Sequence, residues 1–427
     1  MKAAFYTLGC KVNQYESEAM AEQLIKKGYE IVAHNEKADV FIVNSCTVTA
    51  SGDQKTRQAV RRFKKNNPQS CVVLTGCMPQ AYPENSKKLL EADIVIGNKN
   101  NDSLVLVLDE FFAKKERLVN IELHETGDNF RGTLITDFQN RTRAFLKIQD
   151  GCNRFCTYCI IPTSRGRSRS KPLADIQKEL DSIAEKGYKE VVLVGINLSS
   201  YGKDIGEKFT DAVKLACNTK GIERVRLGSL EPDHITDEVI EELALLPHFC
   251  PQFHISLQSG CNNTLKRMNR HYTAEEYYEL CKKLRLTFED ATITTDIMVG
   301  FSLESEEDFN ESLEFAKKIA FEKVHVFPYS VRKGTRAEKL PQLEKKVKEE
   351  RAKKMTEICE EIRKKYLESQ IGKTLEVLIE TTNKNGLYEG YTKNYTPVLV
   401  KCTEDMRSKI IKVKITAVDG DYCIGEF

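Results

Sequence analysis

The chain contains no tryptophan, and none of its apolar runs is long enough to cross a bilayer as a helix. We therefore expect no membrane-spanning segment. An excess of one charge is also missing, because 65 lysines and arginines are balanced by 63 aspartates and glutamates. Any surface for a polyanion must then be a local patch. The N-terminal stretch breaks too early for a secretory signal, so we expect a cytoplasmic protein.

Glycine (23) and proline (11) are too scarce, and hydrophobic residues (41%) too abundant, for a collagen-like or disordered chain. A length of 427 residues allows about two to four globular domains. Fourteen cysteines need an explanation in a reducing compartment, where disulfides are disfavoured. Seven of them lie in apolar or helical patterns and are predicted to be structural, namely Cys71, Cys217, Cys250, Cys281, Cys359, Cys402 and Cys423.

The first 110 or so residues alternate between β-rich apolar runs and helical stretches, which indicates parallel βαβ units. Strands are expected at 3–8, 40–43, 71–74 and 94–96, and helices at 17–27, 53–65 and 86–92. Cys10, Cys46 and Cys77 each follow one of the first three strands. Because the carboxyl ends of parallel strands share one edge, where ligands bind, these thiols could meet in space. Three unrelated loop thiols are the alternative, and spacing alone does not decide between the two.

A second unit begins near Arg143, with a strand at 144–148 followed at once by Cys152, Cys156 and Cys159. Five further strands are expected at 190–194, 224–227, 253–257, 292–299 and 323–327. Amphipathic helices at 173–184, 277–284 and 305–319 lie between or after them. Six strand–helix repeats predict a partial, open (βα)6 barrel rather than a complete eight-stranded one. Its active site should lie at the carboxyl ends of the strands.

A long charged helix is expected over 341–370, followed by a β-rich tail. The tail has strands at 374–380, 387–390, 398–401, 410–418 and 422–427, with a turn at Asn385 and Gly386. This pattern predicts a small OB-like β-barrel, for which RNA or saccharide binding is favoured over a purely structural role. The predicted fold class is thus α/β in three parts. These are a parallel α/β sheet domain (1–113), the partial barrel with its linking helix (138–368) and the small β-barrel (371–427).

The spacing C-x3-C-x2-C of Cys152, Cys156 and Cys159 is typical of a metal site. Soft thiolates select zinc or iron–sulfur. Structural zinc needs four ligands, and no further Cys or His occurs between His124 and Cys217. Three thiolates in one loop leave one metal position open. This favours a 4Fe–4S cluster whose fourth iron binds another ligand, and a non-enzymatic RNA-binding protein that holds zinc is the alternative from a different class.

With Tyr158 before its last cysteine, the motif resembles that of the radical S-adenosylmethionine (SAM) enzymes. The segments 7–18, 43–48 and 75–77 are similar to the N-terminal domain of the methylthiotransferases, and the C-terminal barrel is similar to their RNA-binding TRAM module. Together these resemblances cover nearly the whole chain. The form of the first motif, at 8–18, resembles the branch that acts on N6-threonylcarbamoyladenosine (t6A) beside the tRNA anticodon. Branches that act on isopentenyladenosine or on a ribosomal protein remain alternatives.

The resemblance implies two 4Fe–4S clusters. The cluster on Cys152, Cys156 and Cys159 would bind SAM and cleave it to a radical that removes hydrogen from C2 of the adenine. A second cluster on Cys10, Cys46 and Cys77 would carry the inserted sulfur, and a second SAM would supply the methyl group. Both cysteine sets are expected to face a shared cleft, and the electron donor would be a flavodoxin or ferredoxin. SAM contacts are expected at five positions, for which a structural role is the alternative: Gly195, Asn197, Glu231, Gln258 and Asp296.

Two basic runs are candidates for tRNA phosphate contacts, with a solvated face as the alternative for each. The first comprises Lys55, Arg57, Arg61, Arg62, Lys64 and Lys65, and the second comprises Arg165, Arg167, Arg169 and Lys171. One departure from the family pattern lies at 300–304, which reads Gly-Phe-Ser-Leu-Glu where Gly-Phe-Pro-Gly-Glu is common. Loss of both Pro and Gly changes the backbone options of this turn, so the role of the loop stays open.

Overall fold

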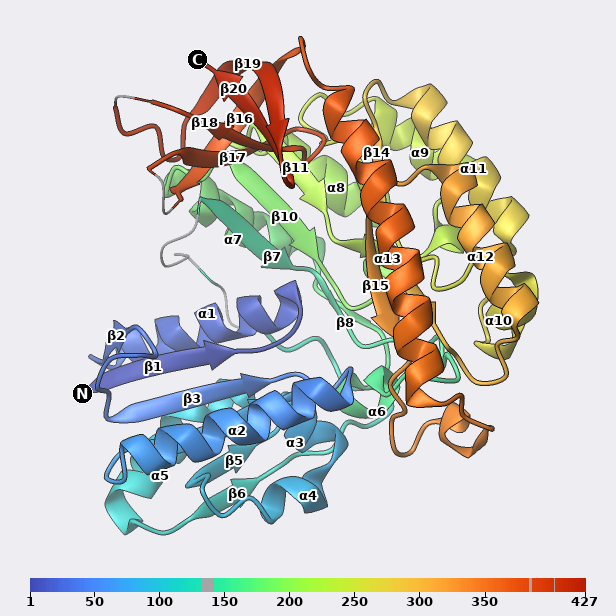
Figure 1. Ribbon diagram of the computed structural model, residues 1–427. Coiled ribbons are helices and arrows are strands. Elements are labelled where there is room, and N and C mark those ends of the chain that lie inside the picture. Colours follow the sequence, from blue (N-terminus) through green and yellow to red (C-terminus); the bar gives the residue numbers. More distant parts are fainter. Residues whose placement is uncertain (133–134, 136–141, 384–385, 403) are drawn as a thin grey trace.

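The computed structural model describes the chain except for residues 133–134, 136–141, 384–385 and 403. Its N-terminal unit is a six-stranded parallel sheet in the order β2-β1-β3-β4-β5-β6 (Figure 1). The strands are β1 (Lys2–Thr7), β2 (Glu30–Val32), β3 (Val40–Ser45), β4 (Cys71–Gly76), β5 (Ile94–Ile96) and β6 (Leu118–Asn120). The helices are α1 (Lys11–Lys26), α2 (Ala50–Asn66), α3 (Cys77–Ala81), α4 (Pro83–Lys87) and α5 (Leu104–Lys114), with a 3-10 turn η1 (Asn101–Ser103) before α5.

Several expected boundaries in this unit are wrong. The helix expected from Ser17 begins at Lys11, because the Ser17 hydroxyl does not cap it but is hydrogen-bonded to Thr7 and Asn44 inside the unit. The helix expected at 86–92 ends at Lys87. The strands β2 and β6 were not predicted from the sequence, because each has only three residues, too few to show an alternating apolar pattern. Because β6 pairs with β5, the sheet extends to Asn120, past the boundary expected at 113.

The central unit is an open barrel of parallel strands in two groups, β11-β10-β7 and β12-β13-β14-β15. Its strands are β7 (Arg143–Lys147), β10 (Glu190–Val194), β11 (Arg224–Leu227), β12 (Ser229–Leu230), β13 (Gln252–Ile255), β14 (Thr292–Val299) and β15 (Lys323–Pro328). Gly228 separates β11 from β12, so these two short strands fill the place of one expected strand. The partial barrel predicted from six repeats is therefore confirmed.

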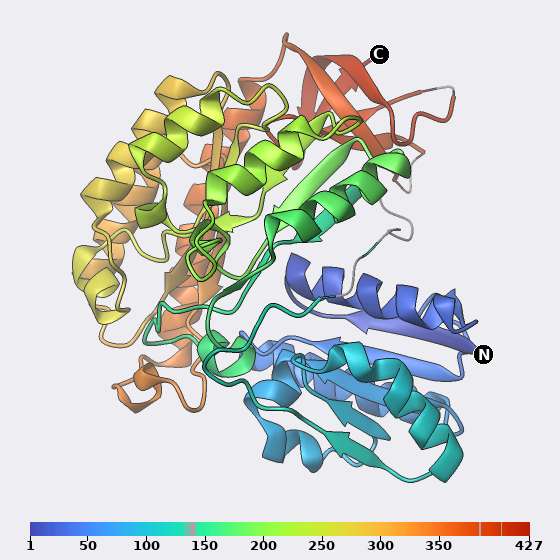
Figure 2. The same cartoon turned by 180° about the vertical axis from the view of Figure 1, so that it is seen from behind.

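Helices cover the outer face of this barrel (Figure 2). They are α7 (Leu173–Glu185), α8 (Phe209–Asn218), α9 (Asp237–Ala244), α10 (Asn262–Arg267), α11 (Ala274–Thr287) and α12 (Glu306–Ile319). The short helix α6 (Ile161–Arg165) instead lies at the junction with the N-terminal sheet, against α3. Short 3-10 turns are η2 (Leu198–Ser200), η3 (Pro232–His234) and η4 (Arg336–Lys339), and a two-stranded ribbon joins β8 (Gln149–Asp150) to β9 (Arg169–Ser170). Capping boxes at Thr273 with Glu276 and at Ser305 with Asp308 begin α11 and α12, and the first of these was expected from the sequence.

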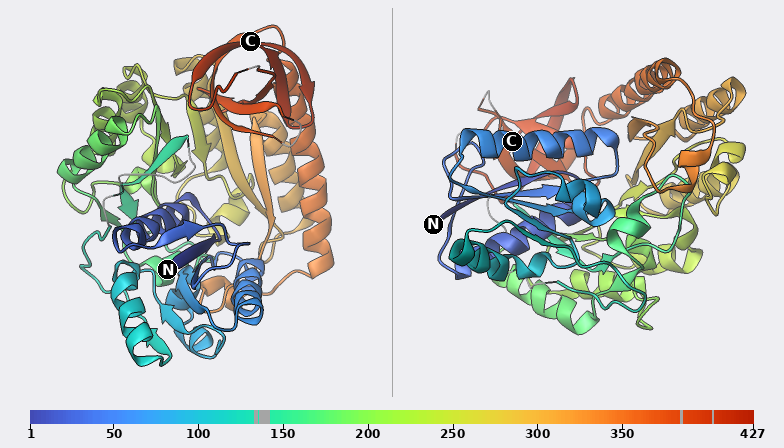
Figure 3. Two further views of the ribbon diagram at one scale, coloured as in Figure 1. Left: turned by 90° about the vertical axis from the view of Figure 1, so that its left-hand side faces the viewer. Right: turned by 90° about the horizontal axis from the view of Figure 1, so that it is seen from below.

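The helix α13 (Lys345–Glu368) runs along β15 and leads into a closed five-stranded barrel (Figure 3). This barrel comprises β16 (Thr374–Thr382), β17 (Tyr388–Thr392), β18 (Pro397–Val400), β19 (Ile410–Asp419) and β20 (Tyr422–Glu426). It confirms the small β-barrel and completes the predicted α/β fold class. The helix starts four residues after the expected Pro341. The expected domain start at residue 138 and Asn385 of the expected turn lie outside the described residues.

Polar contacts join the three units. On β11, Arg224 and Arg226 donate hydrogen bonds of 2.9 to 3.2 Å to C-terminal-barrel carbonyl oxygens of residues 376, 391, 392 and 393. In Figure 1 the C-terminal barrel and α1 lie on the same side of the central barrel, with β7 between them. Val12, Tyr15 and Ala19 of α1 pack into the hydrophobic core of the central barrel. No helix in the described part of the chain has the length and apolarity needed to cross a membrane.

Candidate functional site

Three thiols gather at the carboxyl edge of the N-terminal sheet. Cys10 caps α1 after β1, Cys46 follows β3, and Cys77 begins α3 after β4. The side-chain oxygen of Asn13 lies 3.8 Å from Cys10 Sγ and 3.9 Å from Cys77 Sγ. Gly9 has a φ of 105°, and a Cβ added there would lie 2.9 Å from Cys46 Cβ. The parallel topology thus brings together the three cysteines that sequence spacing alone left undecided.

The other three thiols lie in the loop after β8. The backbone N–H of Cys159 donates to the Cys156 carbonyl (3.0 Å), which closes the loop into a tight turn. Three donor groups approach these sulfurs. The Arg154 N–H lies 3.4 Å from Cys152 Sγ, Asn197 Nδ2 lies 3.8 Å from the same atom, and Arg270 Nη1 lies 3.3 Å from Cys156 Sγ.

The donor set at both places fits an iron–sulfur cluster. Each place offers three thiols, and hydrogen bonds to sulfur are typical of such sites. At the N-terminal one, Val48 N–H lies 3.5 Å from Cys46 Sγ and Asn98 Nδ2 lies 3.8 Å from Cys77 Sγ. Burial raises the pKa of Cys152 to about 11 and that of Cys77 to about 12. Metal binding must therefore displace protons from these thiols.

Among the expected SAM contacts, Gly195 and Asn197 lie directly after β10. The Asn197 N–H donates to Gln149 Oε1 (2.8 Å). A Cβ at Gly195 would lie 2.9 Å from that same oxygen, so only glycine allows this close approach. Gln149, which the sequence patterns did not single out, thus holds the loop that presents Asn197 to Cys152.

Glu231 lies on the same side, because its carboxylate pairs with Arg270, whose guanidinium also approaches Cys156 Sγ. No pattern in the sequence singles out Arg270. Gln258 and Asp296 form a separate neighbouring pair, joined by a backbone hydrogen bond of 2.9 Å. Asp296 Oδ2 lies 3.4 Å from His254 Nε2, which ties it to β13. The structure therefore places Asn197 and Glu231 beside the Cys152–Cys159 loop, and Gln258, which follows β13, beside Asp296 in the middle of β14.

The prediction that the second basic run contacts tRNA phosphates is wrong for three of its four residues. Arg165, Arg169 and Lys171 are only 1%, 7% and 3% exposed. Their charges are paired with buried carboxylates instead of facing solvent: Arg165 with Glu16 and Asp150, Arg169 with Asp150, and Lys171 with Glu179. Arg167 alone is exposed, over the ring of Phe155. In the first patch, Lys64 pairs with Asp93 (2.8 Å), while Lys55, Arg57, Arg61, Arg62 and Lys65 are exposed.

Arg165 links the two cysteine groups. It lies in α6, six residues after Cys159, and its Nη2 donates to Asn13 Oδ1 (2.7 Å) and to Glu16 Oε2 (2.9 Å) of α1. Asn13 is the residue that contacts Cys10 and Cys77. A second contact runs from Asn98 Nδ2 to the Ser164 carbonyl (2.7 Å). One short helix of the central barrel therefore lies directly against the N-terminal thiol site.

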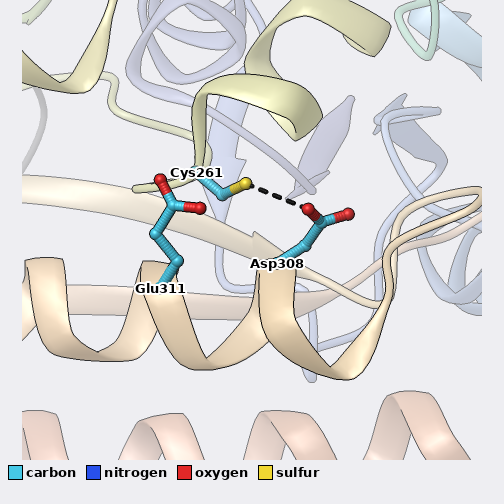
Figure 4. A group of neighbouring side chains, drawn as sticks. All are labelled: Cys261, Asp308 and Glu311. Atoms are coloured by element: carbon cyan, nitrogen blue, oxygen red, sulfur yellow. Dashed lines mark hydrogen bonds between the residues drawn. The ribbon is translucent and has the colours of Figure 1, made fainter.

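A third group of potential metal ligands lies elsewhere, in Cys261, Asp308 and Glu311 (Figure 4). The Cys261 thiol donates to Asp308 Oδ1 (3.2 Å). The other carboxylate oxygen of Asp308 accepts from Arg267 and from the Ser305 N–H at the start of α12. Helix capping and an ion pair account for this arrangement, and we assign no metal to it.

The atypical turn at 300–304 anchors α13. Gly300 has a φ of 68°, and its N–H donates to Glu304 Oε2 (2.6 Å). The same carboxylate accepts from Arg351 of α13 (2.7 Å). Leu303 has a φ of 62°, a left-handed conformation that normally favours glycine.

Three segments of the chain match known families: residues 2–97 "Uncharacterized protein family UPF0004", residues 146–316 "Radical SAM superfamily" and residues 368–427 "TRAM domain". Over 431 residues the chain is 38% identical to the threonylcarbamoyladenosine tRNA methylthiotransferase MtaB of Bacillus subtilis, which covers 99% of this chain and 96% of that protein. MtaB of Aquifex aeolicus is 38% identical over 421 residues, or 97% and 100% of the two chains. The chain belongs to the radical SAM tRNA methylthiotransferases.

The chain also resembles relatives named for another substrate. A tRNA-2-methylthio-N(6)-dimethylallyladenosine synthase of Clostridium botulinum is 36% identical over 431 residues, which cover 98% of this chain and 95% of that protein. Among solved structures, the radical SAM methyltransferase TsrM from Kitasatospora setae has a TM-score of 0.55 at 12% identity, covering 76% of this chain and 72% of that one. That likeness shows the fold alone. Membership of the radical SAM methylthiotransferases implies SAM and 4Fe–4S clusters as cofactors.

Proposed function

We propose that this protein inserts sulfur and a methyl group at C2 of N6-threonylcarbamoyladenosine next to the tRNA anticodon, giving 2-methylthio-N6-threonylcarbamoyladenosine. The observation that carries the proposal is the pair of three-cysteine groups joined through Arg165 and Asn13. Radical formation and sulfur delivery must meet at one substrate atom, and this link fixes the two groups relative to each other. The full-length similarity to relatives named for t6A supports the choice of nucleoside.

In this proposal Cys152, Cys156 and Cys159 hold one 4Fe–4S cluster and Cys10, Cys46 and Cys77 hold the other. When bound, the first cluster supplies the electron that cleaves SAM and the second supplies the sulfur. Asn197 and Arg270 donate hydrogen bonds toward the sulfurs of the first group. The proposed SAM-contacting residues are Gly195, Asn197, Glu231, Gln258 and Asp296. Arg270 donates to both carboxylate oxygens of Glu231 and also approaches Cys156 Sγ, which places Glu231 beside the first cysteine group.

The first test is nucleoside mass spectrometry of tRNA from cells that lack the gene, with and without the gene restored. We expect 2-methylthio-N6-threonylcarbamoyladenosine to disappear and to return. If 2-methylthio-isopentenyladenosine disappears instead, the protein is still a methylthiotransferase, but the assignment of t6A as its substrate is wrong. If neither nucleoside changes in a strain without redundant genes, the tRNA substrate is wrong and a protein substrate becomes the leading alternative.

The second test separates the roles of the two cysteine groups in the reconstituted enzyme. Cys156→Ala should abolish SAM cleavage, whereas Cys46→Ala should retain cleavage and lose methylthiolation. Cys71→Ala is the matched control, because Cys71 is a buried thiol of the same sheet outside both groups. Methylthiolation by Cys46→Ala would contradict the assignment of the second cluster. Zinc in place of iron in the purified protein would favour the non-enzymatic alternative.

The tRNA is the proposed partner, bound through its anticodon stem-loop with the TRAM domain taking part. A flavodoxin or ferredoxin as electron donor and a cytoplasmic location stay predictions. We also propose three domains with the boundaries expected from the sequence, except that the first extends to Asn120. For tRNA phosphates, the exposed residues of the first basic patch (Lys55, Arg57, Arg61, Arg62 and Lys65) remain the proposed contacts.

A further inference from the structure

A cavity of about 350 Å³ lies where the three units meet, and its described lining residues include no cysteine. Lys11 of α1 lines it on one side, and the first residues of β13, β14 and β15 form its floor, with His254, Thr294 and His325 among them. Residues of α13 and the C-terminal barrel complete the wall. The volume is at the lower end of the range for small-ligand pockets, which suits one modified base or its substituent rather than a length of RNA.

The charges of this cavity are unbalanced. Both carboxylates in its wall have guanidinium partners, Glu322 with Arg285 (3.0 Å) and Asp421 with Arg363 (2.6 Å). The ammonium groups of Lys11 and Lys323 also line the cavity. Among the described residues, the ammonium group of neither lysine makes a hydrogen bond or a close ion pair, although Glu190 attracts that of Lys11 and Asp421 attracts that of Lys323 from a distance. Two positive charges are therefore left for a ligand.

The surroundings add to the positive field. Behind Lys11, Glu190 is shared by three arginines, with its oxygens 2.9 Å from Arg226, 3.8 Å from Arg143 and 4.0 Å from Arg224. Arg143 also pairs with Glu380 (2.6 Å), so three guanidinium groups face two carboxylates and one positive charge remains in excess. Lys11 is half-buried, so an apolar ligand would leave its charge unpaired next to this field, whereas an anion would pair with it and with the exposed Lys323 at the rim.

The wall is also polar and aromatic rather than aliphatic. Tyr391 and Tyr395 stack with ring centroids 4.6 Å apart, and the Arg143 guanidinium lies 5.1 Å from each ring. On the strand side, Thr294 Oγ1 and His254 Nδ1 are hydrogen-bonded at 2.9 Å. Such a surface provides a planar face and hydroxyl partners, which match a group that carries both a carboxylate and a hydroxyl.

The position of Lys11 relates this cavity to the proposed chemistry. Lys11 directly follows Cys10, one of the proposed ligands of the sulfur-donating cluster. In adenine, C2 and C6 are both bonded to N1, so a substituent on N6 projects close to the reacting carbon. If C2 faces the N-terminal thiol group, the N6 substituent must lie beside that group as well.

We propose that this cavity binds the carboxylate of the N6 substituent of the substrate adenine, with Lys11 and Lys323 as its charge partners. This inference rests on the proposed function and deepens it. The cavity then selects a nucleoside with an acidic N6 group over one with an apolar N6 group. It gives a physical basis for choosing between the two nucleosides after which the relatives are named, since the sequence identities of both groups to this chain are similar.

The test uses the reconstituted holoenzyme and three anticodon stem-loops that differ only in the target base, with t6A, isopentenyladenosine or unmodified adenosine. Binding is measured by fluorescence anisotropy, and methylthiolated product by mass spectrometry. Lys11→Gln and Lys323→Gln should each weaken binding of the t6A stem-loop about tenfold or more, the loss expected when a charge-assisted bond is removed. Neither should change binding of the other two. Lys26→Gln, at the exposed far end of α1, is the matched control and should change nothing.

Three outcomes overturn the inference. If both variants bind the t6A stem-loop as tightly as the wild type does, neither lysine takes part in binding the N6 carboxylate. An equal loss of affinity for all three stem-loops would mean that the two lysines contact tRNA phosphates and not the N6 substituent. A loss in Lys11→Gln accompanied by lower iron content, with Lys323→Gln unaffected, would mean that Lys11 acts only through the neighbouring cluster. Failure of the proposed function is distinguishable, because the wild-type enzyme would then form no product from the t6A stem-loop.

Discussion

Leu303 is the clearest case of local strain at the scale of single residues. Its φ of 62° lies in the left-handed region, which costs roughly 1–2 kcal/mol for a residue with a Cβ. The side chain is 51% exposed, so it recovers little by burial. In the related motif, glycine is common at this position. The turn is kept in shape by Glu304, which joins the Gly300 N–H to Arg351.

We therefore expect Leu303→Gly to raise the free energy of unfolding by about 0.5–1 kcal/mol, because relief of strain exceeds the extra entropy of glycine in the unfolded chain. Urea denaturation of the metal-free protein measures this change. Leu106→Gly is the control, since Leu106 is also exposed (72%) but lies within α5, where glycine should destabilise by about 1 kcal/mol. A destabilising Leu303→Gly would mean that the leucine side chain supports the turn.

At the scale of elements, the helix α1 packs into the hydrophobic cores of two units. Its residues Met20 and Leu24 pack into the core of the N-terminal sheet, while Val12, Tyr15 and Ala19 pack into that of the central barrel. The same helix carries Glu16, which accepts from Arg165 and from Lys147 (2.8 Å). The helix α1 thus fixes the position of the N-terminal thiol site relative to α6.

Removal of Arg165 should be costly, because it leaves Glu16 and Asp150 buried with fewer cations. We expect Arg165→Ala to lower the free energy of unfolding by about 3–5 kcal/mol, the usual effect of breaking a buried ion pair. Urea denaturation of the metal-free protein measures the change independently of the clusters. Arg167→Ala, two residues away and exposed, should cost less than about 1 kcal/mol. Equal effects of the two variants would contradict the role of the buried pair.

Strands of four or more residues could be predicted from the sequence, because apolar periodicity is local. Helices were predicted less completely, since α5, α8 and α9 were assigned no range and the expected cap at Ser17 is wrong. Cys152, Cys156 and Cys159 could be proposed as ligands from their spacing, whereas the places of Cys10, Cys46 and Cys77 after strands left the question open until the family resemblance was considered. Arg165, Arg169 and Lys171 could not be assigned correctly, because alternating cations look like a phosphate-binding run until their partners are known. One partner, Glu16, lies 149 residues before Arg165 in the sequence, so only the tertiary structure brings them together. Arg270 and Gln149 were missed for the same reason.

At the scale of the whole molecule, the N-terminal sheet and the central barrel meet again around His124. Its Nε2 lies 3.0 Å from Asn98 Oδ1, and Asn98 also donates to Ser164. A Cβ at Gly166 would lie 2.8 Å from His124 Cβ, so the histidine packs directly against the end of α6. The His124 side chain is only 7% exposed. Its charge state therefore affects the contact between two units.

Burial, together with the nearby positive charge of Arg169, lowers the pKa of His124 to about 4. Below its ordinary pKa of about 6.5 the unfolded chain binds a proton that the folded chain does not. Stability must therefore fall as the pH drops from about 6.5 toward 4. From pH 7.5 to pH 5, His124 should account for a loss of about 1–2 kcal/mol in the free energy of unfolding, allowing for screening by solvent.

The variant His124→Gln keeps a hydrogen-bonding side chain without a titrating ring, so its stability should fall less over the same pH range. Urea denaturation of the metal-free protein at pH 7.5 and pH 5 measures the difference. His234, whose pKa is also lowered to about 4, contributes equally in both proteins. Asp128, beside His124, has a pKa lowered to about 2 and does not titrate in this range. The same pH dependence in both proteins would show that His124 does not couple protonation to the contact between the two units.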